Sequence, residues 1–137
     1  MFDVVFWCLG FVAIGACVGS FLNVFIYRVP RHESIVHPPS HCPRCGHLIR
    51  WHDNVPVVGW IKLRGKCRDC RSPISVRYPC VEGFCGILFG GVSVLVEQHG
   101  FSFWFSVAST LLFSLTGAAI LAACLIAYDK KNDKTDA

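Results

Sequence analysis

Charged residues are scarce in this chain of 137 residues, and long stretches of it contain none. Charged side chains make up 16% of the sequence and apolar ones 53%. An ordinary soluble globular domain has about 25% charged residues. The composition therefore excludes that class, and we expect an integral membrane protein.

The apolar residues fall into three runs that are long enough to cross a bilayer as helices. Val4 to Tyr27 carries no charge, and a helix of that length spans a hydrocarbon core of about 30 Å. The other two runs cover Pro79 to Val96 and Phe101 to Tyr128, with "EQHG" as a predicted turn between them. The predicted fold is mainly α, with transmembrane helices in residues 1–28, 79–97 and 101–128.

A secretory signal is also missing, because "MFDVVFWCLG" lacks the basic start that such signals have. This argues against reading the nine cysteines as an extracellular disulfide scaffold. All 13 Lys and Arg residues lie between Arg28 and Arg77 or after Tyr128. Basic loops stay in the cytoplasm, so we expect the loop 29–78 and the tail 129–137 to be cytoplasmic and the N-terminus outside. Membrane topology and anionic lipid account for this charge, and we expect no nucleic-acid partner.

The loop contains two Cys-x-x-Cys pairs in "HCPRCGHLIRWHDNVPVVGWIKLRGKCRDC". This spacing is typical of four-cysteine zinc sites, and four protein ligands close the tetrahedron, which makes the site structural. A loop of this size has too little core to fold alone, so zinc would stabilise it. The alternatives are a redox dithiol, two disulfides, or ligation by nearby histidines such as His41 and His47. The predicted zinc ligands are Cys42, Cys45, Cys67 and Cys70.

A few residues stand out within or beside the apolar runs. Gly15 and Gly19 form a small-x3-small pattern, which predicts close approach of another helix. Asn23 lies inside the first run, where its amide needs a partner, and Arg28 ends that run. Glu82 begins the second run, where it is either a favourable charge near a helix N-terminus or a contact for substrate or methyl donor.

Several motifs together resemble one family. "GSFLNVFIYRVP", the paired cysteines, "NVPVVGWIKLRGKCRDC" and "ISVRYPCVEG" are similar to the N-terminal part of bacterial prepilin peptidases, over residues 10–90. The resemblance implies an A24-type aspartic peptidase of the bacterial inner membrane, which cleaves type IV prepilins or type II secretion pseudopilins at the cytoplasmic face. It also implies N-methylation of the product with S-adenosylmethionine, although no recognisable motif for that cofactor is present.

The catalytic part of the family pattern is largely missing. Asp129 stands where the stretch with the first catalytic aspartate begins, but no Gly-x-Gly-Asp motif follows. An aspartic peptidase needs two carboxylates, one as acid and one as base. We therefore expect the chain to be the N-terminal portion of a prepilin leader peptidase and N-methyltransferase. We expect no proteolytic activity from this chain alone, and a separate catalytic half is a candidate partner. The alternative is a non-enzymatic zinc-knuckle adaptor that binds a partner protein or the cytoplasmic leaflet.

Overall fold

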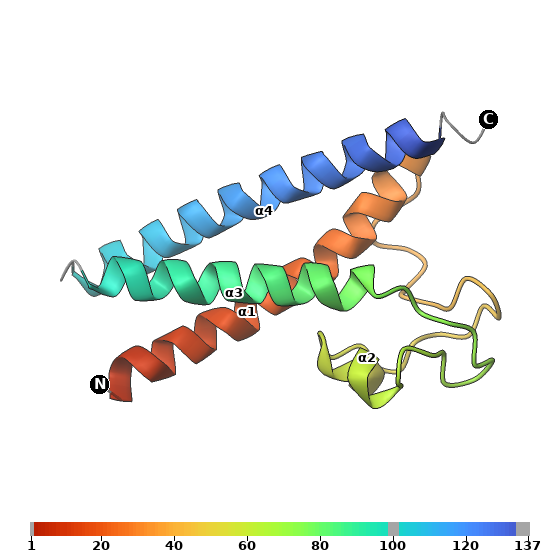
Figure 1. Ribbon diagram of the computed structural model, residues 1–137, viewed down its shortest axis with the longest axis horizontal. Helices are drawn as coiled ribbons and strands as arrows, with labels where there is room; N and C mark the ends of the chain where they lie inside the picture. Colours follow the sequence, from red (N-terminus) through yellow and green to blue (C-terminus); the bar gives the residue numbers. More distant parts are fainter. Residues whose placement is uncertain (1, 99–101, 134–137) are drawn as a thin grey trace.

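The computed structural model describes residues 2–98 and 102–133, and this part of the chain is helical without a β-strand (Figure 1). Three helices are long and apolar enough to cross a membrane, which confirms the predicted fold class. The predicted "EQHG" turn lies partly outside the described residues. The helices are α1 (Phe2–Arg28), α2 (Val58–Lys62), α3 (Arg77–Glu97) and α4 (Phe103–Asp133), with short 3-10 turns at Val29–Arg31 and Trp51–Asp53.

Helices α1 and α3 pack tightly, and glycine makes this possible. A Cβ atom on Gly15 would fall against the backbone carbonyl of Cys85, and one on Gly19 would lie 2.7 Å from the Cα of Glu82. The close approach predicted from the small-x3-small pattern is therefore confirmed. The fully buried Phe89 lies at the centre of the resulting core. The core residues are Phe11, Val81, Cys85, Phe89 and Ala118.

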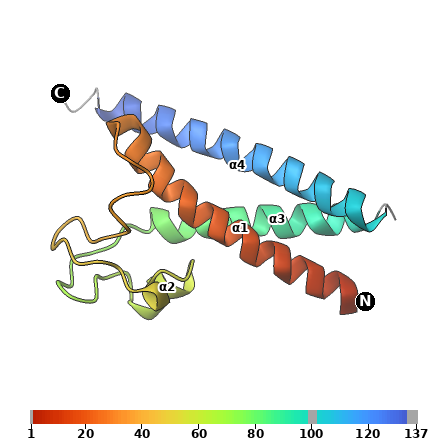
Figure 2. The same cartoon turned by 180° about the vertical axis from the view of Figure 1, so that it is seen from behind.

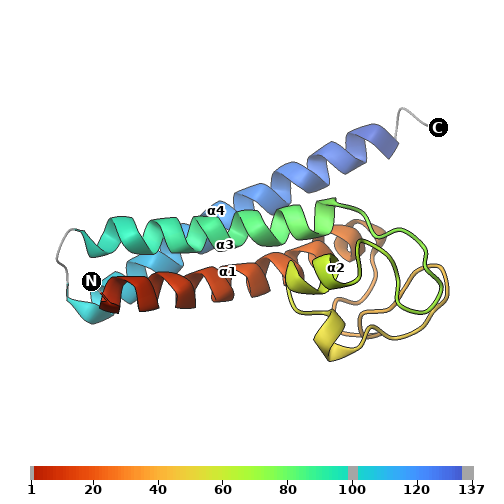
Figure 3. The same cartoon turned by 60° about the horizontal axis from the view of Figure 1, so that its bottom comes forward.

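Helix α4 begins beside the end of α3 and runs back to the end of the bundle that carries the loop (Figures 1 and 3). It continues to Asp133, past the expected boundary at Tyr128. The fall in hydropathy at Asp129 marks the end of the apolar surface and does not end the helix, since lysine is a good helix former and no glycine or proline follows. Residues 134–137 of the expected tail lie outside the described part.

The long loop between α1 and α3 has its own compact arrangement. The indole Nε1–H of Trp60 donates to the carbonyl of Ile74 at 3.1 Å. Gly65 adopts φ +66°, and a Cβ there would strike the Trp60 ring. Figures 2 and 3 show most of the loop extending beyond the bundle, whereas α2 lies back beside it.

Candidate functional site

The two cysteine pairs form two similar turns. In each turn a backbone N–H donates to the carbonyl of the first cysteine, from Gly46 to Cys42 at 2.9 Å and from Arg71 to Cys67 at 3.1 Å. Gly46 and Arg71 have positive φ angles of 72° and 60°. Each turn is flanked by an isolated antiparallel bridge, His41 with Leu48 and Lys66 with Pro73. The repeated geometry directs all four thiols to one point.

The four sulfurs are spaced as metal ligands require. All lie within 4.8 Å of one another. Cys42 Sγ is 3.8 Å from Cys70 Sγ, and Cys45 Sγ is 4.0 Å from Cys67 Sγ. A tetrahedral zinc site with Zn–S bonds of about 2.3 Å has sulfur-to-sulfur edges of about 3.8 Å. The cluster therefore fits a zinc ion bound by four thiolates, which leaves no ligand position for a substrate.

The surroundings shift the thiol pKa values in opposite directions. A hydrogen bond from the backbone N–H of Cys45, aided by others, lowers the pKa of Cys42 to about 6. The Ser72 hydroxyl lowers the pKa of Cys70. At Cys45 the N–H of His47 favours the thiolate, but burial and the three other sulfurs outweigh it and raise the pKa of Cys45 to about 12. Sulfurs this close disfavour multiple thiolates, and a divalent cation offsets that repulsion.

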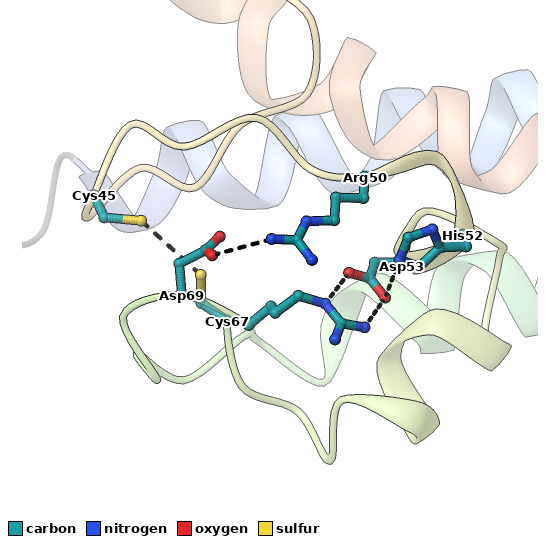
Figure 4. Close-up of polar contacts among 7 residues, drawn as sticks. Cys45, Arg50, His52, Asp53, Cys67 and Asp69 are labelled. Atoms are coloured by element: carbon teal, nitrogen blue, oxygen red, sulfur yellow. Dashed lines mark hydrogen bonds and ion pairs between the residues drawn. The ribbon is translucent and has the colours of Figure 1, made fainter.

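A buried ion pair joins the two halves of the loop next to the cluster (Figure 4). Asp53 accepts hydrogen bonds from Arg68 at 2.5 and 2.6 Å, and its side chain is only 3% exposed. This bond, followed by the charge of Arg68, holds the pKa of Asp53 below its ordinary value. Arg50 and Asp69 make a longer contact of 3.8 Å that is more exposed. The Asp53–Arg68 pair was missed in the sequence, where no local pattern links the two residues.

Arg28, the last residue of α1, is buried. It is 7% exposed, and its guanidinium donates to the carbonyls of Ser34 and Pro38, both at 2.8 Å. Five guanidinium N–H donors can serve several carbonyls at once, so Arg28 fastens the start of the loop to the end of α1.

Asn23 and Glu82 connect neighbouring segments of the chain. The Asn23 amide donates to the carbonyl of Tyr78 in the first turn of α3 at 3.1 Å. Glu82 accepts the N–H of Val57 at 2.6 Å, which fastens the loop to α3. Val57 is the centre of a γ-turn, with φ 60° and ψ −51°, and Val58 N–H donates to Pro56 O at 2.6 Å.

Asp129 lies at the loop end of the bundle. Its carboxylate pairs with Arg77 at 2.8 Å, and both side chains are about one-third exposed. The second guanidinium nitrogen of Arg77, Nη2, is buried and has no hydrogen-bond partner among the described residues. Both side chains line a cavity of about 160 Å³, and Asp129 supplies the one carboxylate among its described lining residues. The lining residues are Asn23, Ile26, Tyr27, Ser75, Arg77, Tyr78 and Asp129.

Comparison with known proteins identifies relatives for most of the chain. A Myxococcus xanthus prepilin leader peptidase/N-methyltransferase is 59% identical over 76 residues, which cover 56% of this chain and 23% of the relative. An Escherichia coli O78:H11 type 4 prepilin-like proteins leader peptide-processing enzyme is 36% identical, over 84% of this chain and 46% of the relative. The chain thus spans less than half the length of these relatives. No solved structure matches it.

The family model described as the bacterial peptidase A24 N-terminal domain matches residues 13–96. The match includes most of α1, all four clustered cysteines and nearly all of α3. This agrees with the resemblance read from the sequence motifs, and the chain belongs to the bacterial peptidase A24 N-terminal domain family.

Proposed function

We propose that this chain forms the membrane and zinc-loop part of a prepilin leader peptidase/N-methyltransferase. The observation that carries the proposal is the family match across the two membrane helices and the loop between them. The substrates would be type IV prepilins or type II secretion pseudopilins, processed at the cytoplasmic face of the inner membrane. Use of S-adenosylmethionine as the methyl donor rests on the family resemblance.

The four-cysteine cluster would hold a structural zinc ion. The spacing of the sulfurs and the twin turns support this, and the closed ligand set assigns zinc to folding of the loop. Metal analysis of the purified chain tests it: we expect one zinc per chain, and loss of that zinc in a Cys42→Ser, Cys67→Ser double variant. Cys124→Ser is the control, because Cys124 is an exposed thiol on α4 outside the cluster. Metal-free wild-type protein would contradict the assignment.

Asp129 would supply one of the two carboxylates needed for peptide hydrolysis. Its support is its place at the loop end of α4 and its position in a cavity that Asn23 and Arg77 also line. General acid and base roles need a second carboxylate, which would come from the catalytic half of the relatives. Arg77 would hold the Asp129 carboxylate in position through the ion pair.

A complementation assay tests this role. The chain is produced with the remaining C-terminal part of the Escherichia coli relative, and cleavage of a prepilin is followed by gel shift. We expect cleavage by the pair, none by either part alone, and none with Asp129→Asn. Asp69→Asn is the control, since Asp69 lies in the loop beside the cysteine cluster. Equal cleavage by the wild-type and Asp129→Asn chains would reject the catalytic role. No cleavage by the wild-type chain together with the C-terminal part would favour the alternative function, a non-enzymatic zinc-knuckle adaptor.

The proposed orientation puts the loop and the end of α4 in the cytoplasm. It is supported by the distribution of the basic residues, because every Lys and Arg lies between Arg28 and Arg77 or after Tyr128. Alkaline phosphatase is active only outside the cytoplasm, so a fusion after Glu97 should be active and a fusion after Lys131 inactive. The reverse pattern would overturn the orientation.

A further inference from the structure

Helix α2 lies beside the bundle instead of extending away from it with the rest of the loop. Figures 1 and 3 show α2 level with the first turns of α3 along the long axis of the molecule. The hydrogen bond from Val57 N–H to Glu82, at 2.6 Å, fixes this position. Glu82 is part of the span Arg77–Glu97, so α2 begins at a depth that the membrane helix itself occupies.

The side chains of α2 divide into an inner and an outer set. Gly59 is buried, and a Cβ there would strike the carbonyl of Asp53. Trp60 also faces the protein, where its indole binds the Ile74 carbonyl. Val58 and Ile61, by contrast, are 58% and 62% exposed. The outer side of α2 therefore carries two apolar side chains that the rest of the described chain leaves more than half exposed, followed by Lys62 at its end.

The segment just before α2 also carries exposed apolar side chains. Trp51 is 83% exposed and Val55 is 41% exposed. On α3, the span residues closest to Glu82 that are also exposed include Phe84, at 52%, and Ile87, at 75%. A membrane helix presents such side chains to lipid. Along the axis of the bundle, the exposed apolar side chains of α2 therefore lie at about the same depth as the lipid-facing side of α3.

Cations follow directly after the apolar face. Lys62 lies 3.9 Å from the Asp53 carboxylate and is still 53% exposed, and Arg64 is also exposed. Lysine and arginine beside an apolar face extend their charged ends to the headgroup layer while their stems cover apolar surface. Apolar side chains, an exposed tryptophan and adjacent cations are the composition of elements that lie in a membrane interface.

We propose that α2 is embedded in the interface of the leaflet on the side of the cysteine loop. Lipid acyl chains contact Val58 and Ile61, and anionic headgroups contact Lys62 and Arg64. The fixed depth at Glu82 favours lipid over a partner protein, because lipid surrounds an uncovered surface at that depth. The loop is thus attached to the membrane by α2 as well as by its two flanking helices.

Site-specific photocrosslinking tests this proposal. The full chain is prepared in nanodiscs of phosphatidylethanolamine and phosphatidylglycerol, with p-benzoylphenylalanine in place of Ile61. Leu48 is the matched control, since it lies beside the first cysteine turn of the same loop and is 61% exposed. Ile87, at 75% exposure on α3, is the positive control. Adducts are identified by intact mass spectrometry after irradiation.

We expect lipid adducts at position 61 in amounts comparable to those at position 87, and background amounts at position 48. A second probe at Val58 should give the same result, which keeps the test decisive if the first variant does not fold. Adducts at position 87 but not at 61 and 58 would overturn the proposal. Adducts from 61 and 58 to a second copy of the chain or to another protein would overturn it as well.

Discussion

Replacement of Asp53 by asparagine should lower the free energy of opening of the cysteine loop by about 2 kcal/mol. The Asp53 side chain is 3% exposed and accepts hydrogen bonds from Arg68 at 2.5 and 2.6 Å. Removal of one partner from a buried ion pair costs about 3–5 kcal/mol. Arg68 is 34% exposed. Solvent therefore stabilises the guanidinium left behind and reduces the expected cost.

The stabilisation by Asp53 should also depend on pH in one direction. The Arg68 guanidinium holds the pKa of Asp53 below its ordinary value of 3.8. For a carboxyl whose pKa is lowered by folding, the contribution is full above the ordinary pKa and is lost as pH falls through the folded-state pKa. The difference between wild type and Asp53→Asn should thus be constant near neutral pH and shrink below pH about 4.

Hydrogen exchange of the loop measures this effect. The reporter amides are those of Cys67, which donates to Ser72 O at 2.8 Å, and Ile74, which donates to Gly65 O at 2.7 Å. A loss of about 2 kcal/mol raises the opening equilibrium about 30-fold. Asp69→Asn is the control, because Asp69 makes one exposed contact of 3.8 Å with Arg50. Equal exchange in the two variants would refute the role given to the Asp53–Arg68 pair.

Three further experiments test the backbone strain, the helix packing and the ion pair described above. Val57→Gly should raise the thermal unfolding midpoint in detergent micelles, because it relieves about 1 kcal/mol of strain at φ 60°; a lower midpoint would contradict this. Gly15→Ala should lower the same midpoint, because the added Cβ meets the α3 backbone and costs about 1–3 kcal/mol of unfolding free energy. Gly10→Ala is the control, since a Cβ there meets nothing within 4 Å and should not lower the midpoint. A double-mutant cycle of Arg77→Gln and Asp129→Asn should give a coupling energy of about 0.5–1 kcal/mol, and zero coupling would reject the ion pair.

Sequence features with a local signature predicted the main parts of the structure. Uncharged runs of sufficient length indicate membrane helices whatever surrounds them. The Cys-x-x-Cys pairs predicted a four-sulfur cluster because two intervening residues bring two thiols to one side of a turn. The small-x3-small pattern at Gly15 and Gly19 likewise predicted the close approach of α3.

The contacts between segments far apart in the sequence could not be predicted in the same way. Glu82 and Val57 are 25 positions apart, and Arg77 and Asp129 are 52 apart. No periodicity connects such residues, since their contact depends on how the helices pack. Glu82 illustrates this point: its position in the sequence indicated a favourable charge near a helix N-terminus or a contact for substrate or methyl donor, and neither interpretation included the hydrogen bond from the γ-turn at Val57.

The order of residues along the chain has a consequence for biosynthesis. The four clustered cysteines, Asp53 and Arg68 all precede α3, whereas Glu82, which binds the loop, belongs to α3 itself. The ribosome makes the chain from its N-terminus, so every residue of the cluster and of the ion pair is present before the second membrane helix has been completed. The loop can therefore bring its four sulfurs together while only α1 is inserted. Its hydrogen bond to Glu82 must wait for α3, which makes docking of the loop on that helix a later event than its folding.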